Sequence, residues 1–533
     1  MSQKTWTLVA AVLGSGIVFL DSTIVNVALP KIGQELPRVV VGQLEGLNYV
    51  YNGYLLSLSS LLILAGALND YYGRRRMFLL GLLGFGATSV LCGLAPNMEL
   101  LIVFRVLQGA AGALLVPGSL SLLTATFSGE EQGRAFGIWA GASGATTILG
   151  PVVGGLLVDT LSWRAAFFVN VPLVLIAAWA TMRYVAESRN EQASGHFDWL
   201  GALDVALAVG GLSFGLIYGG QRRWQDPLAF VFLGIGVLAL VAFPFLMRRR
   251  ADPLVPLSLL RSRNFTVTNI STFLIYGALY VSGYYLPLFT QNVIGYTAAA
   301  AGLVGIAASI LLTLFSPRFG LLAARHGPRR FMALGPLIMA LGLAWLARAP
   351  GDGTAWVLRP GDPSSFIPPA SYFIDFLPYA LLFGTGLTIM VAPLTTALMT
   401  SVPVRNSGLA SAINNAVSRV GPQLAGAVIF VIIAATFYGA LVALLPSADL
   451  DVLHQTISPL NPPPAGTPAA VVSAAQQAST GAFHLAMLFS AAMLVVGAAV
   501  NWLGIVPIAA QRAEEPRQEA AREAVVDGGT AAG

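Results

Sequence analysis

The chain has 533 residues, of which 56% are hydrophobic and only 10% are charged, against roughly 25% charged residues in an average soluble domain. With a mean hydropathy of +0.74, this composition excludes an ordinary soluble globular protein and is typical of a chain that folds in lipid. One cysteine and four widely separated histidines offer neither a disulfide framework nor a local metal motif, and neither lysine stands in a P-loop nucleotide-binding motif.

Apolar runs long enough to cross a bilayer recur along the chain and predict an all-α membrane protein. We predict fourteen membrane-spanning helices, near residues 7–29, 46–68, 77–95, 98–121, 134–157, 164–184, 199–219, 227–247, 265–289, 297–317, 329–347, 371–395, 406–436 and 481–505. The interval 407–440 is long enough for one tilted helix or for two shorter spans. Segments 348–370 and 443–480 are too polar to span and are expected to form loops, and the tail 510–533 is expected to be only partly ordered.

The basic residues predict how the chain is oriented in the membrane. Most of the 29 stand before the first span or after even-numbered spans. The positive-inside rule therefore places both termini in the cytoplasm and the loops 348–370 and 443–480 outside. Because the basic residues form short clusters between apolar runs, the net charge of +5 does not indicate a nucleic-acid partner.

Two segments in different parts of the chain form an internal repeat. The segment GALNDYYGRRRMFLLG at 66–81 aligns without a gap with GLLAARHGPRRFMALG at 320–335. Gly-Pro at 150–151 and Pro117 are echoed, in the same spans of the second half, by Gly-Pro at 421–422 and Pro393. The shared order predicts two six-helix halves related by an axis along the membrane normal, with the seventh and eighth spans inserted between them. The predicted domains are the first half at 1–190, the inserted helices at 191–260, the second half at 261–509 and a cytoplasmic tail at 510–533.

Four segments resemble the motifs of one transporter family. They are LDSTIVNVALP at 20–30, GALNDYYGRRR at 66–76, FRVLQGAAGALLVP at 104–117, and LGPVVGG at 149–155 followed by SWRAAFFVNVP at 162–172. On these motifs the chain resembles the major facilitator superfamily, and specifically its fourteen-span drug:proton antiporters of the multidrug efflux type. The resemblance implies the major facilitator fold and a central cavity lined by the first and fourth spans.

Asp21 and Arg105 are charges inside predicted spans, where an unpaired charge costs on the order of 3 kcal/mol or more. At 1.5 Å per helical residue the two lie at similar depth, so direct or water-mediated pairing is expected. Burial favours the protonated carboxyl and a nearby guanidinium favours the carboxylate, so the pair could exchange a proton near physiological pH. Competition between a proton and a lipophilic cation for Asp21 would give antiport. The alternative is a static ion pair that locks two helices.

A second motif, at the cytoplasmic end of the second span, contains Gly66, Asp70, Gly73, Arg74, Arg75 and Arg76. Glycines permit close helix approach or a tight turn, and an aspartate can accept bonds from an arginine or a helix N-terminus. The resemblance implies a gate that closes the cytoplasmic side, and the alternative is plain positive-inside anchoring. In the second-half copy Ala324 replaces the acid, so a weaker latch is expected there.

A third motif, which the resemblance associates with antiport, contains Gly150, Pro151, Gly154 and Gly155. Proline kinks a helix and glycines let it pack closely on a neighbour. Ordinary small-residue packing is the alternative. Thr146 stands where the family pattern often has another glycine, which leaves the closest packing at this point open.

Further polar and aromatic residues of the spans are candidates to line a substrate cavity, since such groups suit amphiphilic ligands. They are Asn26, Tyr49, Asn52, Trp139, Tyr276, Tyr280, Asp375, Asn414, Asn415 and Arg419. Arg419 and Asn415 share a helix face near mid-depth, where they contact substrate or stabilise helix packing. Asp375 and Asp204 lie near span ends and are either hydrated there or, for Asp375 above all, accessory cation or proton sites.

The sequence therefore predicts a proton-driven exporter of lipophilic small molecules, preferably cations, in the cytoplasmic membrane. The expected partners are the small-molecule substrate, protons and the lipid bilayer, with the proton-motive force in place of any cofactor. A lipid or other amphiphilic cargo on the same fold is the closest alternative. A membrane-embedded enzyme would need clustered catalytic groups in the spans, which the sequence lacks, and a channel would not explain the paired gate motifs.

Overall fold

The computed structural model describes residues 2–37, 39, 43–190, 197–221, 224–250, 252–359, 361–446, 457–464 and 466–506, so the predicted tail 510–533 lies outside the described residues. The first half consists of α1 (Gln3–Glu35), α2 (Gln43–Tyr72), α3 (Arg74–Gly93), α4 (Met98–Thr126), α5 (Gly129–Thr160), α6 (Ala165–Phe168) and α7 (Asn170–Tyr184). The inserted helices are α8 (Trp199–Gln221) and α9 (Pro227–Arg249), followed by the short α10 (Leu257–Arg261).

The second half begins with α11 (Arg263–Leu288), which a π-helical turn at Phe289–Ile294 extends. It continues with α12 (Ala298–Val304), α13 (Ile306–His326) and α14 (Arg329–Leu346). A π-helical turn at Tyr372–Phe376 leads into α15 (Leu377–Thr400), and α16 (Ser407–Leu444) and α18 (Ala469–Gly504) complete the described part. The interval 407–440 is thus one helix and not two spans.

The predicted spans are confirmed as long helical segments. Thirteen segments of the described chain are long and apolar enough to cross a membrane. The fourteenth predicted span, 134–157, lies within α5, a helix of 32 residues. The fold class predicted from hydropathy, an all-α membrane protein, is therefore correct.

One predicted loop is partly wrong. Segment 443–480 was expected to form a loop because it is too polar to span, but α18 already begins at Ala469. Its first three turns are rich in alanine, the best helix former, and Ala474, Ala475 and Ala478 are buried in the core of the second half. The 38 residues of α16 and the 36 of α18 correspond to about 57 and 54 Å, well beyond a hydrocarbon core of about 30 Å. The polar turns therefore extend the helix beyond the bilayer.

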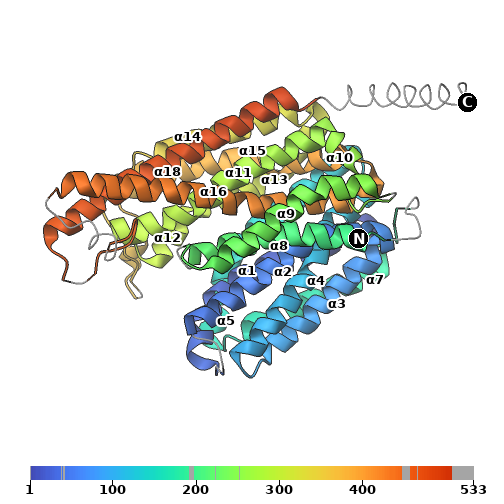
Figure 1. Cartoon of the computed structure of the whole chain (residues 1–533), viewed down its shortest axis with the longest axis horizontal. Helices are drawn as coiled ribbons and strands as arrows, with labels where there is room; N and C mark the ends of the chain where they lie inside the picture. Colours follow the sequence, from blue (N-terminus) through green and yellow to red (C-terminus); the bar gives the residue numbers. More distant parts are fainter. Residues whose placement is uncertain are drawn as a thin grey trace, which may run out of the picture.

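Both ends of the described chain lie at the same end of the helix bundle, which we call the base. Lys4 near the start of α1 pairs with Glu131 at the start of α5, and the neighbouring Glu130 pairs with Arg325 at the end of α13. Arg329, which begins α14, donates a hydrogen bond to the carbonyl oxygen of Trp502 near the end of α18. The start of α1 and the end of α18 accordingly lie toward the same side in Figure 1.

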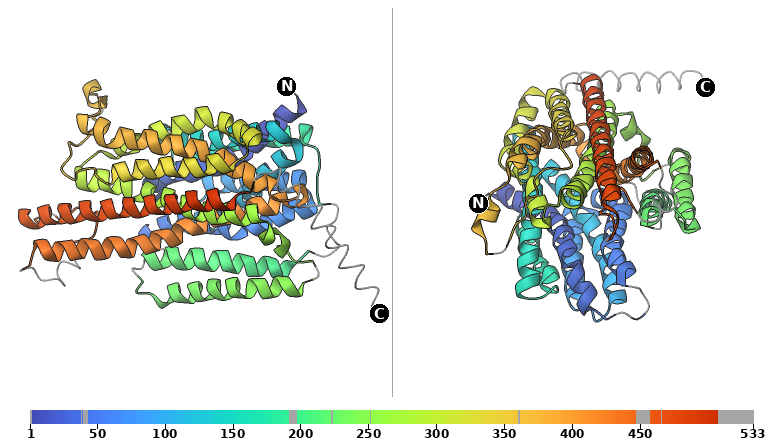
Figure 2. Two further views of the ribbon diagram at one scale, coloured as in Figure 1. Left: turned by 90° about the horizontal axis from the view of Figure 1, so that it is seen from above. Right: turned by 90° about the vertical axis from the view of Figure 1, so that its left-hand side faces the viewer.

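The two halves share a hydrophobic core at the base. One buried cluster combines first-half residues with Leu398, Met399, Leu409, Ala410 and Ala416 of α15 and α16. Beyond this cluster the described cores separate by half. One is built from first-half residues such as Ile24 and Met98, and the other runs from Ile275 to Ile505. The halves diverge toward the far end of the molecule, and α8 and α9 lie at one side of both (Figures 1 and 2).

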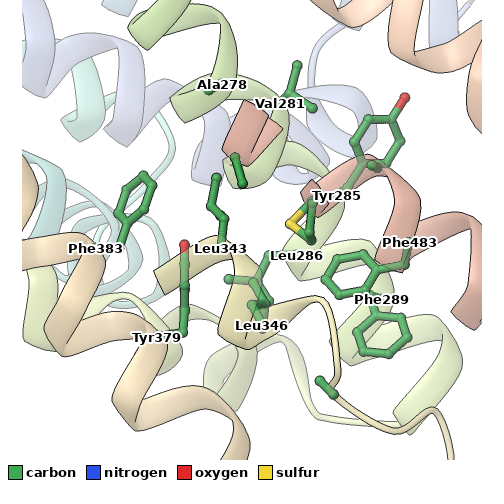
Figure 3. Packing of buried hydrophobic residues seen from close by; sticks show 14 of the residues in the cluster. Ala278, Val281, Tyr285, Leu286, Phe289, Leu343, Leu346, Tyr379, Phe383 and Phe483 are labelled. Atoms are coloured by element: carbon green, nitrogen blue, oxygen red, sulfur yellow. The ribbon is translucent and has the colours of Figure 1, made fainter. Parts of the chain in front are cut away.

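The core of the second half positions α11, α14, α15 and α18. Phe289 and Phe483 stack with ring centroids 3.9 Å apart and nearly parallel planes. Figure 3 shows this pair beside Leu346 and Leu286, with Tyr379 and Phe383 on the opposite side of the cluster. This packing holds together the half that presents α16 to the first half.

Candidate functional site

Asp21 and Arg105 form the expected pair in the interior of the first half. Nη1 of Arg105 donates a hydrogen bond of 2.6 Å to Oδ2 of Asp21, and both side chains are fully buried. Because Asp21 belongs to α1 and Arg105 to α4, the contact joins the helices that contain the segments LDSTIVNVALP and FRVLQGAAGALLVP. A buried pair of this kind is costly to break, by about 3–5 kcal/mol when one partner is removed.

Two amides complete the site around Asp21, and the sequence did not single out either. Nε2 of Gln108 and Nδ2 of Asn170 donate hydrogen bonds of 3.1 and 2.9 Å to Oδ1 of Asp21. Both amides also donate to the hydroxyl of Ser89, at 2.7 and 3.2 Å. Four helices, α1, α3, α4 and α7, thereby meet at one carboxylate. The spacing of Gln108, three residues after Arg105 on the same helix face, is the one signal that could have identified it.

Arg105 has acceptors besides Asp21. Its Nη1 also donates to Oε1 of Gln108 at 2.6 Å, and its Nε donates to the carbonyl oxygen of Val50 at 3.2 Å. Its guanidinium lies 4.0 Å from the ring centroid of Tyr54, which is within the range of a cation–π contact. The arginine therefore keeps partners in a state in which Asp21 is neutral.

The motif at the end of α2 contacts the opposite half. Both oxygens of Asp70 accept backbone hydrogen bonds from the first turn of α16, from the amide nitrogens of Gly408 at 3.2 Å and Leu409 at 2.9 Å. Arg74 pairs with Asp70 at 3.0 Å and donates to the carbonyl oxygen of Val404, just before α16. The carboxylate thus stands at a helix N-terminus, where partial positive charge favours an anion. A Cβ on Gly66 would lie 2.5 Å from the carbonyl oxygen of Gly408, so only glycine permits this approach of α2 to α16.

The remaining residues of this motif bind within the first half. Glu187, which the sequence did not single out, accepts hydrogen bonds from the amide nitrogens of Arg75 and Arg76 at 3.1 and 3.2 Å. Gly73 has a φ of +112°, a backbone conformation that glycine adopts without strain. The six-residue motif therefore divides into residues that contact the second half and residues that anchor α3 to the segment after α7.

The equivalent contact on the other side of the base joins α5 to α13. A Cβ on Gly133 would lie 2.5 Å from the carbonyl oxygen of Gly320 and 2.8 Å from Cβ of Ala324. The residue that replaces the acid in the second-half repeat thus lies in the interface as a small packing residue. The ion pair here is between Arg325 and Glu130, at 2.8 Å, and about half of each side chain is exposed. An exposed pair contributes little to stability, in keeping with the weaker latch expected for this copy.

The glycine motif of α5 faces α1 beside Asp21. A Cβ on Gly154 would lie 3.1 Å from Cα of Ile24, and one on Gly150 would clash with the side chain of Thr23. A Cβ on Gly155 would have no described atom within 4 Å, and the side chain of Pro151 lies outside the described residues. Thr146 is accommodated because it lies opposite Gly16 of α1. A Cβ added to Gly16 would be 3.9 Å from the methyl group of Thr146.

Several cavity candidates have local structural partners. Trp139 is buried and donates from Nε1 to the hydroxyl of Ser119 at 3.2 Å. Asn414 donates to Oδ1 of Asn269 at 3.2 Å and to the hydroxyl of Thr272 at 2.8 Å, which ties α16 to α11. Asn414 thus faces α11, on a different side of α16 from Arg419. Asp375 lies at the far end, beside Arg348, and Asp204 lies in α8, beside Asp198.

Other candidates lie where the halves face each other. Tyr276 and Tyr280 stack along α11 with ring centroids 6.5 Å apart. Tyr280 interacts electrostatically with Tyr51 of α2, a residue the sequence did not single out, and Tyr51 interacts with Arg419. Asn26, which is exposed, and Tyr49 and Asn52, which are half-buried, complete the candidate set.

An apolar groove opens on the second half near the base. It has a volume of about 400 Å³ and is lined by Leu260, Phe265, Thr266, Asn269, Ile270, Phe273, Leu274, Ile413 and Val417. Its walls are α11 and α16, and α10 closes one end. It suits an alkyl or aromatic group and offers almost no polar surface.

Two helical halves joined at the base, with buried charges between their helices, define a multi-pass membrane transporter. The family model described as Major Facilitator Superfamily matches residues 11–426, and the chain belongs to this superfamily. The chain is 34% identical over 452 residues to the multidrug resistance protein Stp of Mycobacterium tuberculosis, covering 85% of this chain and 80% of that protein. It is 32% identical to the tetracenomycin C resistance and export protein of Streptomyces glaucescens, covering 81% and 76% of the two chains.

A solved structure supports the fold. The crystal structure of the human organic anion transporter MFSD10 (TETRAN) matches with a TM-score of 0.58, at 14% sequence identity. The match covers 93% of this chain and 99% of that chain. At this identity the likeness concerns the fold alone.

Proposed function

We propose that the protein is a proton-coupled antiporter that exports lipophilic small molecules, including drugs, across the cytoplasmic membrane. The names of the two relatives, which denote multidrug resistance and antibiotic export, support the cargo class. The base faces the cytoplasm in this proposal, because Arg76, Arg330 and Arg405 are exposed there. No cofactor takes part, since the proton-motive force supplies about 2.3 kcal/mol per charge per 100 mV.

The observation that carries the coupling is the set of spare partners around Arg105. A proton on Asp21 removes the negative charge, and in a static pair this would leave a buried cation without compensation. Here Gln108, Val50 and the ring of Tyr54 still bind Arg105 when Asp21 carries a proton. Protonation of Asp21 then weakens the four-helix junction while Arg105 keeps its other hydrogen-bond partners, and the halves can rearrange.

The contacts at the base control access to the space between the two halves. Asp70 and Arg74 hold α2 against the first turn of α16, and Gly133 holds α5 against α13. In this state cargo reaches the space between the halves from the far side, and export requires both contacts to open. The glycines of α5 pack on α1 next to Asp21, so a change at the carboxylate reaches one of the two contacts through α5 itself.

The test is drug-driven proton movement in proteoliposomes that contain a pH-sensitive dye. Tetracenomycin C serves as the probe cargo. We expect wild-type protein to move protons when tetracenomycin C is added, and Asp21→Asn to abolish this flux while the protein remains monodisperse and helical. Glu131→Gln, which removes a surface carboxylate at the base, is the matched control and should retain the flux. Intact flux in the Asp21→Asn protein would show that coupling resides elsewhere.

A further inference from the structure

Arg419 lies in the middle of the interface between the two halves. It stands twelve residues into α16, or about 18 Å from the base end of that helix. It follows Gly408 and Ala412 by eleven and seven residues, which places all three on one face of the helix. Gly408 and Ala412 contact Gly66 of α2, so the same face, two to three turns farther from the base, directs Arg419 toward the first half.

Aromatic side chains of both halves lie in the same region as this position. Arg419 is within electrostatic range of Tyr51 and Tyr54 of α2, and Tyr51 is within the same range of Tyr280 of α11. Tyr280 stacks with Tyr276 one turn away, and 54% of its surface is exposed. Arg419 and phenol rings of both halves therefore lie in one region between the halves, which is where alternating access places a transported molecule.

This space contains a positive charge that no described residue balances. Arg419 makes neither a hydrogen bond nor an ion pair with the described residues, and its Nε is buried without an acceptor. Gln423, one turn farther along the same face, has a buried amide oxygen that also lacks a partner among them. An arginine remains protonated in a protein, so loss of its proton does not relieve the energetic cost of burying the charge. By contrast, Arg105 and Arg74 are each paired with a carboxylate.

We propose that Arg419 is the anchor of the cargo-binding site and that the cargo is an aromatic amphiphile carrying an oxyanion, such as a carboxylate or an ionised phenol. The guanidinium fork binds a planar oxyanion, and the rings of Tyr276 and Tyr280 offer stacking surfaces to the aromatic part. A cationic cargo is disfavoured, because both oxygens of Asp21 already accept hydrogen bonds and the carboxylate is fully buried. This inference rests on the proposed export function and names the cargo of that site.

The test uses three probes of one shape and different charge: 2-naphthoate, 2-naphthamide and 2-naphthylmethylammonium. Their binding to full-length protein in nanodiscs is followed by isothermal titration calorimetry. We expect 2-naphthoate to bind wild-type protein about tenfold or more tightly than 2-naphthamide, as a charge-assisted hydrogen bond would produce. Arg419→Gln should remove this preference and leave the affinity for 2-naphthamide unchanged. Arg419→Lys, which keeps the charge, should retain most of it.

Arg330→Gln is the control, because Arg330 is an exposed arginine at the base of the second half. It should leave all three affinities as they are. The proposal is overturned if wild-type protein prefers 2-naphthylmethylammonium, if it fails to bind 2-naphthoate, or if Arg419→Gln keeps the anion preference. Loss of export with intact anion preference would instead count against the proposed function alone, so the two failures are distinguishable.

Discussion

At the scale of single residues, the three side chains that donate hydrogen bonds to Asp21 connect it to different helices. Arg105 and Gln108 both belong to α4, and Gln108 also donates to Ser89 of α3. Asn170 begins α7 and likewise bonds Ser89 as well as Asp21. It therefore adds α7 to the helices that a change at the carboxylate reaches. Asn170 is consequently a structural part of the junction rather than an accessory to the ion pair.

Replacing Asn170 should lower stability measurably. Asn170→Ala leaves Oδ1 of Asp21 with Gln108 alone and deprives the Ser89 hydroxyl of one donor, so we expect a loss of about 1–3 kcal/mol. Thermal unfolding of the purified protein in detergent measures the loss as a lower Tm. Asn415→Ala is the matched control, because the amide of Asn415 bonds only Ser411 of its own helix among the described residues. Equal Tm values for the two variants would contradict the prediction.

Residues differ in how well the sequence predicts their part in the site. Asp21 and Arg105 could be predicted because charge is rare and costly inside a span, so each charged residue needs a partner. Gln108, Asn170 and Tyr54 could not, because uncharged polar side chains occur in spans for many reasons. Glu187 lies in a segment between helices, where an acid carries no signal of its own. Its partners are backbone nitrogens of Arg75 and Arg76, which only the fold brings within reach.

At the scale of helices, equivalent glycines make equivalent contacts in the two halves. Gly150 and Gly154 pack α5 on α1, and a Cβ on Gly421 would lie 3.0 Å from the ring of Phe273, so α16 packs on α11 in the same way. Gly66 and Gly320, which align in the internal repeat, both lie at contacts between the halves. Positions that align in the repeat thus make corresponding contacts in the two halves.

The start of α18 shows why helix ends were harder to predict than helices. Hydropathy reports burial in lipid, and the first three turns of α18 project beyond the lipid. They are helical because alanine favours helix and because they pack on the extended end of α16. A criterion based on spanning the bilayer assigns such turns to a loop.

Closing the base should depend on the lack of a side chain at Gly66. Gly66→Ala places a Cβ 2.5 Å from the carbonyl oxygen of Gly408, so α2 and α16 must separate. We expect the variant to populate a base-open state more than wild type, seen as longer distances between spin labels at positions 72 and 405 in electron–electron double resonance. Gly155→Ala is the control, since no atom of the described part of the chain lies within 4 Å of its Cβ. It should leave the distances unchanged or slightly stabilise the helix. Identical distance distributions for the two variants would refute the role of Gly66.

At the scale of the whole molecule, the base and the far end differ in how the halves are connected. The base carries a shared core, the Asp70 contacts at α16 and the Arg325–Glu130 pair. The described cores of the far end are separate, and the second half extends farthest there through α16 and α18 (Figure 2). The two ends of the molecule are therefore not equivalent, and the orientation of the chain in the membrane decides which end faces the cytoplasm.

The orientation can be tested by labelling with a membrane-impermeant maleimide in intact cells. Cys92 is the only cysteine and is buried, so wild-type protein should not react and Cys92→Ala provides the background for new sites. Ala470→Cys, on the exposed first turn of α18, should react from outside, whereas Arg330→Cys at the base should react only after permeabilisation. Leu488→Cys is the internal control: it is about 27 Å farther along α18, within the lipid, where a thiolate is disfavoured. Its reaction should be slow on either side. Labelling of Arg330→Cys in intact cells would show that the orientation is opposite to the one proposed. Slow labelling of Ala470→Cys would show that α18 does not project beyond the bilayer.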